Sequence, residues 1–191
     1  MKSICVFCGS SKGKKVIFSE AAIQLGETLA ARNISLVFGG GKIGLMGLVA
    51  DACMKNGGLV TGIIPKFLAK DEIAHNGISE LIVVQSMHER KLKMSQLADG
   101  FIALPGGFGT LEELCEILTW VQLDIINKPI GILNVDGYFD HLIDQFNQMV
   151  EEQLLKPANL KFFVQSDNVD ELLSKMRSMK SISKPFTEKF I

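Results

Sequence analysis

A glycine-rich turn followed by two glutamates is the part of this sequence best suited to chemistry. Residues 105–113 read PGGFGTLEE and separate an apolar run from a segment with apolar residues at helical spacing. Glycines let the backbone approach a phosphate closely, and the first unpaired N–H groups of a helix attract an anion. Glu113 follows about one helical turn later, ~5 Å from such a site. The segment therefore predicts chemistry on a phosphorylated small molecule.

Glu113 also has a purely structural explanation. Residues 110–113 match a capping box, in which the Thr110 hydroxyl accepts from the N–H of the third helical residue. The Glu113 carboxylate would then accept from the N–H of the cap residue. Glu112 lies about 100° away around the helix, so the two glutamates cannot share one role equally. Both explanations of Glu113 stay open at this point.

A second charged cluster, SMHERK at residues 86–91, begins another helix. Ser86 and Glu89 fit a capping box, which gives Glu89 a structural role. Arg90 lies beside an apolar stripe that includes Met87 and Met94, where a guanidinium needs a carboxylate or phosphate partner. The alternative is an arginine that extends along the apolar surface into solvent.

Alternating strands and helices must position these residues. The strands are expected at 3–8, 35–38, 59–64, 80–84, 100–104, 129–134 and 162–164, and the helices near 16–32, 44–56, 87–98, 110–124, 138–154 and 168–178. This alternation indicates right-handed βαβ units. We expect a Rossmann-like, three-layer α/β/α fold with a mostly parallel sheet. One nucleotide-binding domain would span residues 1–180, followed by a C-terminal tail at 181–191.

Glycines follow three of the expected strands, at residues 8–11, 39–47 and 105–110. In a parallel sheet, all three turns open onto one edge, which makes a nucleotide-sized cleft plausible. The 39–47 segment matches neither the dinucleotide fingerprint nor a Walker loop. Its glycines fit a tight turn and a ligand contact equally well. The candidate ligand contacts in the first two turns are Gly9, Ser10, Gly41 and Gly44.

Composition excludes several classes of protein. The chain has 191 residues, of which 47% are hydrophobic, and a formal net charge of −1, whereas nucleic-acid binders carry a basic surplus. No apolar run of about 18 residues occurs, so no membrane span is expected. The N-terminus leads directly into a strand without the pattern of a signal peptide, so a cytoplasmic location is expected.

The cysteines predict neither a metal site nor disulfides. Cys5 and Cys8 form a CxxC pair, but positions three apart on a strand face opposite sides of the sheet. Cys53 and Cys115 lie in apolar helical patterns, and four reduced, structural thiols are expected. The sequence contains no HExxH or GxSxG motif and no carboxylate-rich metal motif. We therefore expect no metal and no cofactor.

Taken together, these segments resemble the Lonely guy (LOG) family. MHERK at 87–91 followed by PGGFGTLEE at 105–113 is similar to the two-part signature of that family, and the segments 5–11, 39–50, 63–66 and 128–131 also resemble it. The similarity extends from Ile4 to Asn168. Only the C-terminal tail is uncharacteristic.

The resemblance implies a function and an assembly. LOG proteins are Rossmann-like homodimers or larger assemblies that release a free base and ribose 5-phosphate from cytokinin riboside 5'-monophosphates, often also from AMP. The family has also carried the label "lysine decarboxylase". That activity needs a Schiff-base lysine and a partner for the pyridinium ring of its cofactor, and nothing in the sequence marks such a pair.

The resemblance also implies site residues. Arg90 and Glu113 correspond to the catalytic centre, and Glu72 corresponds to a substrate contact although Lys70 and Asp71 replace the usual Pro-Arg before it. The remaining substrate contacts implied in this part of the chain are Lys91, Gly107, Phe108, Gly109, Thr110, Leu111, Glu112 and Thr119.

The expected mechanism is hydrolysis of an N-glycosidic bond. The 105–110 turn holds the 5'-phosphate, Glu113 stabilises positive charge on the ribose or activates water, and Arg90 orients Glu113 and the sugar. The base would contact apolar residues such as Met87, Phe108 and Trp120. Apolar residues on more than one face of helices 110–124 and 138–154 suggest a homodimer or a higher homo-oligomer. The alternatives are a broader nucleoside-monophosphate nucleosidase and a non-catalytic carrier of a nucleotide or of the molybdenum cofactor.

Overall fold

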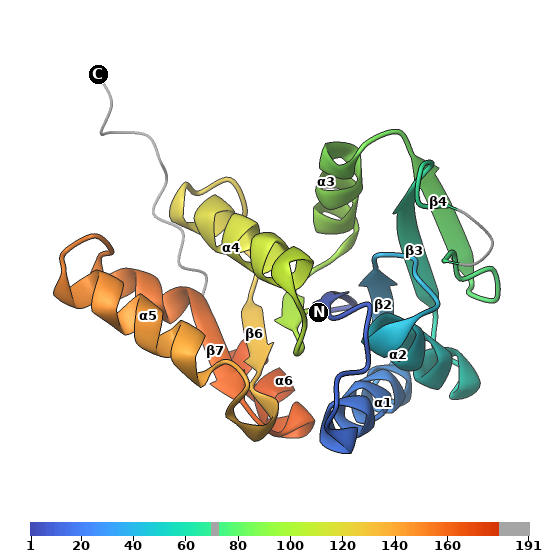
Figure 1. Ribbon diagram of the computed structural model, residues 1–191, viewed down its shortest axis with the longest axis horizontal. Coiled ribbons are helices and arrows are strands. Elements are labelled where there is room, and N and C mark those ends of the chain that lie inside the picture. Colours follow the sequence, from blue (N-terminus) through green and yellow to red (C-terminus); the bar gives the residue numbers. More distant parts are fainter. Residues whose placement is uncertain (70–72, 180–191) are drawn as a thin grey trace.

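The computed structural model describes residues 1–69 and 73–179, which form a parallel sheet between two layers of helices (Figure 1). The strands are β1 (Ser3–Phe7), β2 (Ser35–Phe38), β3 (Val60–Pro65), β4 (Glu80–Val84), β5 (Phe101–Ala103), β6 (Ile130–Leu133) and β7 (Phe163–Ser166). The α-helices are α1 (Val16–Ala31), α2 (Gly44–Lys55), α3 (Met87–Leu97), α4 (Phe108–Gln122), α5 (Asp140–Glu151) and α6 (Val169–Ser178). Two short 3-10 helices, η1 (Val135–Gly137) and η2 (Pro157–Phe162), flank α5.

The strand order places a natural crevice in the middle of the sheet. The order is β4-β3-β2-β1-β5-β6-β7, and every pairing between these strands is parallel. The chain builds outward from β1 to β4 and then returns to the other side of β1 with β5. The loops after β1 and β5 therefore diverge, and ligands bind at such a switch point outside the carboxyl ends of the strands.

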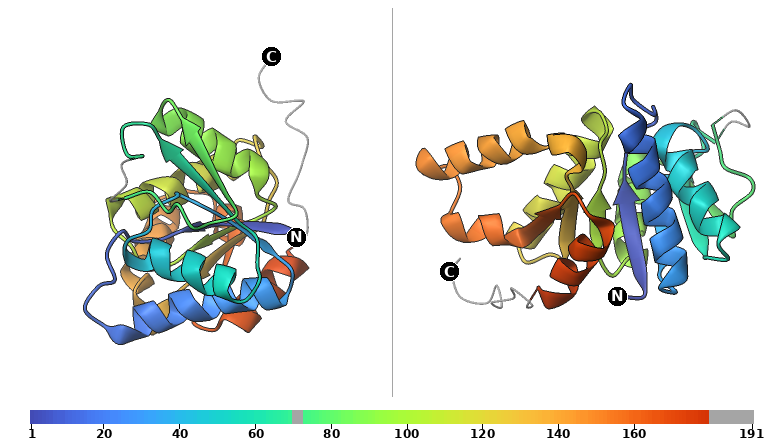
Figure 2. Two further views of the ribbon diagram at one scale, coloured as in Figure 1. Left: turned by 90° about the vertical axis from the view of Figure 1, so that its right-hand side faces the viewer. Right: turned by 90° about the horizontal axis from the view of Figure 1, so that it is seen from below.

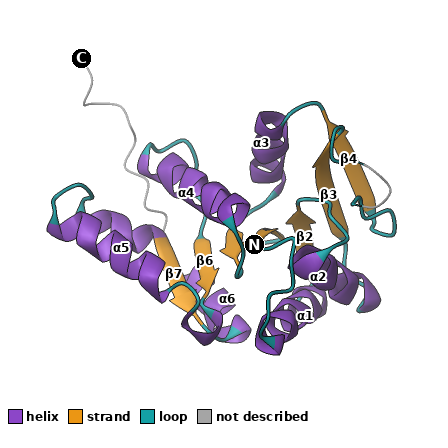
Figure 3. Ribbon diagram, viewed as in Figure 1, coloured by secondary structure: helices purple, strands orange, loops and turns teal. Residues whose placement is uncertain are grey.

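Alternating side chains of each strand face two separate cores. In β1, Val6 joins the core beneath α1, α2 and α6, whereas Phe7 joins the core beneath α3, α4 and α5. This period of two follows from strand geometry, and burial on both faces explains why the strands are almost wholly apolar. Figure 2 shows the strands between α3 on one face and α1 and α2 on the other, and Figure 3 shows helices on both sides of the strands.

The expected fold class is confirmed, and the expected elements agree with the observed ones to within about three residues. The difference that matters most for the site is the start of α4, which lies at Phe108 rather than at residue 110. The expected C-terminal tail, 181–191, lies outside the described residues. Among the helices that the structure describes, none combines the length and the apolar composition needed to cross a bilayer.

Candidate active site

A cleft of about 450 Å³ opens at the carboxyl ends of the central strands. Its walls come from the loops after β1, β2 and β3, from the start of α3, and from the first turn of α4. The lining residues are Cys8, Gly9, Ser10, Gly39, Gly41, Ile43, Met46, Ile64, Leu68, Ile73, Met87, Arg90, Gly107, Phe108, Gly109, Thr110, Glu112 and Glu113. The structure thus brings the three glycine turns to one cavity, as the parallel sheet predicts.

The turn between β5 and α4 has occupied carbonyls and free N–H groups. The Pro105 carbonyl accepts from the Gly9 N–H at 3.1 Å, and the Gly106 carbonyl accepts from the Tyr138 hydroxyl at 2.6 Å. In the described part of the chain, the N–H groups of residues 107–110 donate to no backbone carbonyl. Four free donors at the positive end of a helix form an anion-binding surface.

Space for an anion is present at the same turn. A Cβ built on Gly107 or Gly109 would have no described heavy atom within 4 Å, so both glycines face open volume. Gly106 differs, because a Cβ there would lie 2.1 Å from the Thr110 Oγ1 and 2.8 Å from the Gly9 nitrogen. Gly106 therefore closes the turn, and Gly107 and Gly109 leave its outer side accessible.

The capping-box explanation for Thr110 and Glu113 is wrong. Gly107 is the N-cap of α4, and Thr110 is the third residue of the helix, with its side chain buried against Gly106. Because glycine has no side chain, the N-cap residue of α4 cannot accept a hydrogen bond from the first turn of the helix. The other predicted box is present: the Ser86 hydroxyl accepts from the Glu89 N–H at 3.1 Å, and the Glu89 carboxylate accepts from the Gln85 N–H at 2.7 Å.

Glu113 lines the cleft from α4, and its side chain is partly buried. Burial raises the pKa of its carboxyl from 4.5 to about 7, although the positive charges of Arg90 and Lys91 oppose the rise. In the described residues, its carboxylate accepts no hydrogen bond from another side chain or from the backbone. Glu113 therefore changes protonation near neutral pH and is free to contact a ligand.

Arg90 is buried and held by the backbone of two strands. Its Nε donates to the Ile63 carbonyl at 3.0 Å, and its Nη2 donates to the Gly39 carbonyl at 2.8 Å. A Cβ on Gly39 would lie 1.8 Å from that Nη2 atom, so only glycine leaves room for the guanidinium. Arg90 is thus fixed at the cleft by the ends of β2 and β3 rather than extending to solvent.

Arg90 and Glu113 line the same cleft from opposite helices, α3 and α4. Their charges interact, but in the described part of the chain no ion pair within 4.0 Å joins them. A positive and a negative group therefore face one cavity, and each remains able to contact a ligand placed between them.

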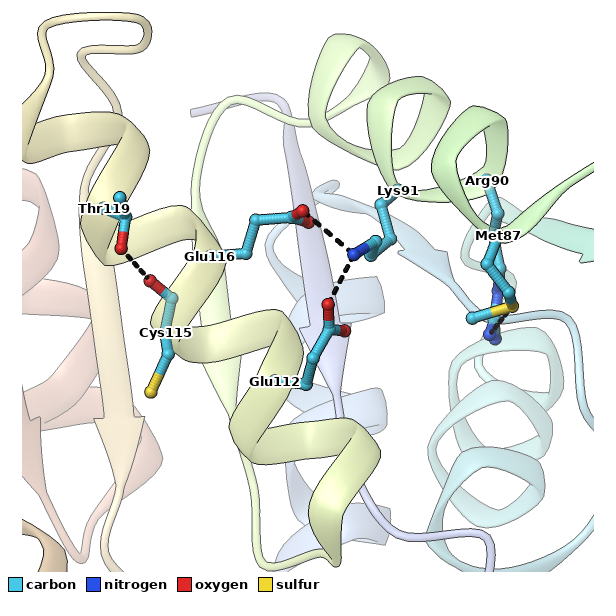
Figure 4. Close-up of polar contacts among 7 residues, drawn as sticks. All are labelled: Met87, Arg90, Lys91, Glu112, Cys115, Glu116 and Thr119. Carbon is cyan, nitrogen blue, oxygen red and sulfur yellow. Dashed lines mark hydrogen bonds and ion pairs between the residues drawn. The ribbon is translucent and has the colours of Figure 1, made fainter.

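Lys91 lies outside the cleft lining and links α3 to α4. Its Nζ donates to the carboxylates of Glu112 and of Glu116, the latter at 2.9 Å (Figure 4). Figure 4 also shows that Lys91 and Arg90 leave α3 in different directions. Because its ammonium is neutralised by two carboxylates, Lys91 connects the two helices that carry Arg90 and Glu113.

The structure separates the other predicted contacts into two groups. Gly9, Ser10, Gly41, Gly107, Phe108, Gly109, Thr110 and Glu112 line the cleft together with Arg90 and Glu113. Gly44 packs against Ser10 and Leu111 packs against the core, whereas Thr119 donates to the Cys115 carbonyl on the far side of α4 (Figure 4). Glu72, with Lys70 and Asp71, lies outside the described residues, but Ile73 next to it lines the cleft.

All four cysteines are free thiols, as expected. Cys5 and Cys8 belong to the two different cores, which confirms that they face opposite sides of the sheet. Cys115 was expected in an apolar helical environment and is instead exposed on α4. Within residues 1–69 and 73–179, no three acidic, histidine or cysteine side chains converge in a way that could hold a metal ion.

Sequence reasoning missed the residues that shape the cleft without a charged side chain. Gly39 accommodates Arg90, and Ile64, Leu68, Ile73 and Met46 form apolar walls. Ile73, the first described residue after position 69, contacts the glycine turn after β2: its carbonyl accepts from the Lys42 N–H at 2.8 Å. Gly39 directly follows a buried strand, a position at which a glycine signals close approach, but the sequence does not say which group approaches.

The chain is similar to known proteins over most of its length. A family model described as "possible lysine decarboxylase" matches residues 46–176. The cytokinin riboside 5'-monophosphate phosphoribohydrolase LOG5 of Arabidopsis thaliana is 48% identical over 182 residues, covering 95% of this chain and 80% of the relative. LOG7 of the same plant, with the same activity in its name, is 48% identical over 190 residues, covering 100% and 88%.

Solved structures establish the fold independently. The molybdenum cofactor binding protein of Rippkaea orientalis superposes with a TM-score of 0.70 over 93% of this chain and 97% of that chain, at 22% identity. A likeness at that identity concerns the fold alone, whereas the plant relatives share about half of their residues with this chain. The chain therefore belongs to the "possible lysine decarboxylase" family, as a member of its LOG group.

Proposed function

We propose that this protein hydrolyses the N-glycosidic bond of adenosine 5'-monophosphates, including N6-substituted ones, and releases the free base and ribose 5-phosphate. One observation carries the proposal: the free N–H groups of the 107–110 turn and the Arg90–Glu113 pair line a single cleft. The plant relatives, which are about 48% identical, are named for this reaction on cytokinin riboside 5'-monophosphates.

In the proposed mechanism, the 5'-phosphate binds at the N-terminus of α4. The N–H groups of residues 107–110 donate to its oxygens, and the open volume beside Gly107 and Gly109 accommodates them. This binding energy comes from a part of the substrate remote from the bond that breaks, and it positions the sugar for reaction. A nucleoside without the phosphate loses that energy and is a poor substrate.

Glu113 acts beside the sugar in its ionised form. Cleavage of the C1'–N9 bond passes through an oxocarbenium-like state, which the carboxylate stabilises; alternatively, the carboxylate activates the water that attacks C1'. The water oxygen adds to C1' and its proton passes to Glu113 or to solvent, while the departing base takes a proton from solvent. Because burial raises the pKa of Glu113 to about 7, the rate is expected to rise with pH through about 7 and then level off.

Arg90 orients the reacting groups. Its guanidinium is held by the Ile63 and Gly39 carbonyls, so its remaining surface toward the cleft has little freedom. A fixed positive charge there attracts Glu113 and the sugar hydroxyls without losing much side-chain entropy on binding. Of the three expected base contacts, Met87 and Phe108 support an apolar base site in the cleft, whereas Trp120 packs against the core instead.

The chemistry of the cleft does not fit lysine decarboxylation. Among the described residues that line it there is no lysine, and pyridoxal phosphate needs a lysine amine for its Schiff base. Lys91 is the nearest candidate in sequence, and two carboxylates on α4 engage its ammonium. The family description thus names an activity that these residues do not support.

Two further statements belong to the proposal. Between α4, α5 and η2 lies an apolar groove of about 230 Å³, lined by Leu118, Phe146 and Met149 among others. A homodimer, or a larger homo-oligomer that uses the same interface, would cover it. Light scattering of the purified protein at micromolar concentration tests this, and a monomer would contradict it. A cytoplasmic location fits the four free thiols.

Chromatography of the products tests the function. The purified protein is incubated with AMP and with isopentenyladenosine 5'-monophosphate, and adenosine and isopentenyladenosine serve as controls. Release of base from the two monophosphates only is the expected result, and the ratio of their rates gives the preferred base. Tight binding of both nucleotides with no release of base would instead indicate a carrier.

A further inference from the structure

Tyr138 contacts the glycine turn from outside the cleft. Its hydroxyl donates to the Gly106 carbonyl at 2.6 Å, although 32 residues separate the two in sequence. Tyr138 and Gly106 line a second cavity of about 310 Å³, which adjoins the cleft at Gly9, Ser10 and Gly107 and is not lined by Arg90 or Glu113. None of the sequence patterns singled out Tyr138, which is the only tyrosine in the chain.

The loop that carries Tyr138 is held in several ways. Its ring packs edge-on against Phe18 of α1, with centroids 5.5 Å apart, and against Phe139, with centroids 5.1 Å apart. Phe139 is almost completely buried, and its N–H donates to the Asn134 side chain at 2.7 Å. The hydroxyl therefore reaches Gly106 from a fixed platform rather than from a mobile loop.

The hydrogen bond fixes the orientation of one peptide group. Because a trans peptide is planar, the Gly107 N–H points opposite to the Gly106 C=O. With the carbonyl directed at Tyr138, this N–H is directed away from Tyr138, and Gly107 lines the cleft. Without the hydroxyl, two consecutive glycines could rotate the peptide at little cost and present the carbonyl oxygen to the anion.

We propose that Tyr138 is a positioning residue for the phosphate: its hydroxyl holds the Gly106–Gly107 peptide with the Gly107 N–H available to the anion. This inference rests on the proposed function, which assigns the 5'-phosphate to the turn. Tyr138 touches no reacting atom, and it acts only through the orientation of that peptide.

Tyr138→Phe tests the inference, because it removes the hydroxyl and keeps the ring contacts. Calorimetry measures the affinity for ribose 5-phosphate, a product that is not turned over. We expect about tenfold weaker binding, as for one lost hydrogen bond. KM for AMP should rise by a similar factor, whereas kcat and its pH profile should stay within about twofold, since Glu113 is not affected.

Lys15→Gln is the matched control, because Lys15 precedes α1 and contacts the loop that carries Tyr138. Lys15 pairs with Asp136 beside Tyr138, so the variant loses a loop contact and retains the hydroxyl. Its affinity for ribose 5-phosphate should match that of the wild type, and both variants should show wild-type cooperative unfolding. Equal weakening in the two variants would overturn the inference, because the effect would then belong to the loop.

The single tyrosine provides a direct spectroscopic readout. In protein labelled with carbon-13 at the tyrosine ring carbon that bears the hydroxyl, one resonance reports on Tyr138, and it should shift when ribose 5-phosphate fills the turn. An unchanged affinity in Tyr138→Phe, or a resonance that does not respond, would overturn the inference. A wild type that binds ribose 5-phosphate without releasing base from AMP would contradict only the proposed function.

Discussion

Two of the three glycine turns at the cleft, those after β2 and β5, use glycines for different purposes. In the turn after β2, a Cβ on Gly39 would lie 1.8 Å from the Arg90 guanidinium, and one on Gly44 would lie 2.2 Å from the Ser10 backbone. In the turn after β5, Gly107 and Gly109 have no described atom within 4 Å of such a Cβ. One turn uses glycine to pack protein against protein, whereas the other leaves space for a ligand.

The difference shows that glycine content alone does not locate a binding site. Both turns follow a buried strand and precede a helix, so their sequences are equally compatible with a phosphate site. Only the surroundings separate them: the first turn fixes Arg90, and the second exposes free N–H groups. Substitutions in the two turns should therefore affect different kinetic constants.

Gly39→Ala should have the largest effect among substitutions in the two turns. The added methyl overlaps the position of the Arg90 Nη2 atom, so the guanidinium must move, and a displacement of about 1 Å can lower kcat about 10²-fold. Steady-state kinetics with AMP measure kcat and KM for the variant. Gly77→Ala is the control, because a Cβ there makes an ordinary contact with His75, and it should leave kcat unchanged. A fully active Gly39→Ala enzyme would contradict the role of Arg90.

Gly109→Ala should separate binding from stability. Its methyl enters open space at the second residue of α4, so the fold loses nothing and the helix gains about 0.5–1 kcal/mol from reduced chain entropy. The same methyl occupies volume assigned to the phosphate, and the affinity for AMP should fall about tenfold. Calorimetry and urea denaturation of one preparation check both. Unchanged affinity would remove the phosphate from this turn.

Lys91→Met should shift the pH dependence rather than abolish activity. The change leaves the Glu112 and Glu116 carboxylates unneutralised, and both raise the pKa of Glu113, which Lys91 and Arg90 lower. The rise of kcat/KM with pH should move to higher pH, with a several-fold loss at pH 7. Lys91→Arg should restore the profile, since a guanidinium can bridge both carboxylates. A loss of activity with an unmoved profile would instead mean that Lys91 contacts the substrate.

The smallest expected effect concerns stability. The pKa of Glu113 is about 7 in the fold and 4.5 as an ordinary carboxyl, so the native state holds the extra proton between these values. Ionisation of the buried group destabilises the wild type fully above pH 7 and not below pH 4.5. Glu113→Gln should therefore be more stable by about 1–3 kcal/mol at pH 8, with the difference vanishing toward pH 4.5. Urea denaturation at several pH values measures it.

The sequence predicted the elements well and the boundaries of the site less well. Apolar strands between glycines and amphipathic helices indicated the parallel sheet, and its switch point explains why the glycine turns meet. The start of α4 was misplaced because Thr110 and Glu113 imitate a capping box, whereas the helix begins two residues earlier behind an uncapped glycine. Local sequence cannot distinguish these, since the outcome depends on Gly106 packing against Gly9 and Thr110.

Long-range contacts account for the remaining differences. Besides the Met87 sulfur, Arg90 donates to the backbone carbonyls of Ile63 in β3 and of Gly39 directly after β2, and carbonyls carry no sequence signal. Thr119 and Leu111 share a helix with Glu113, but their positions on α4 direct them away from the cleft. Tyr138 follows η1 and β6, the strand beside β5, and reaches the turn across 32 residues of sequence. The positions of these side chains could be known only from the three-dimensional structure.

The most direct test of the central claim compares the wild type with Glu113→Gln on AMP. Calorimetry should give both proteins AMP affinities within a few-fold of each other, because the amide preserves the shape of the site. Single-turnover chromatography should show adenine release reduced at least about 10³-fold in the variant, as for loss of a group that acts in the transition state. Adenine release at the wild-type rate by Glu113→Gln would contradict the account.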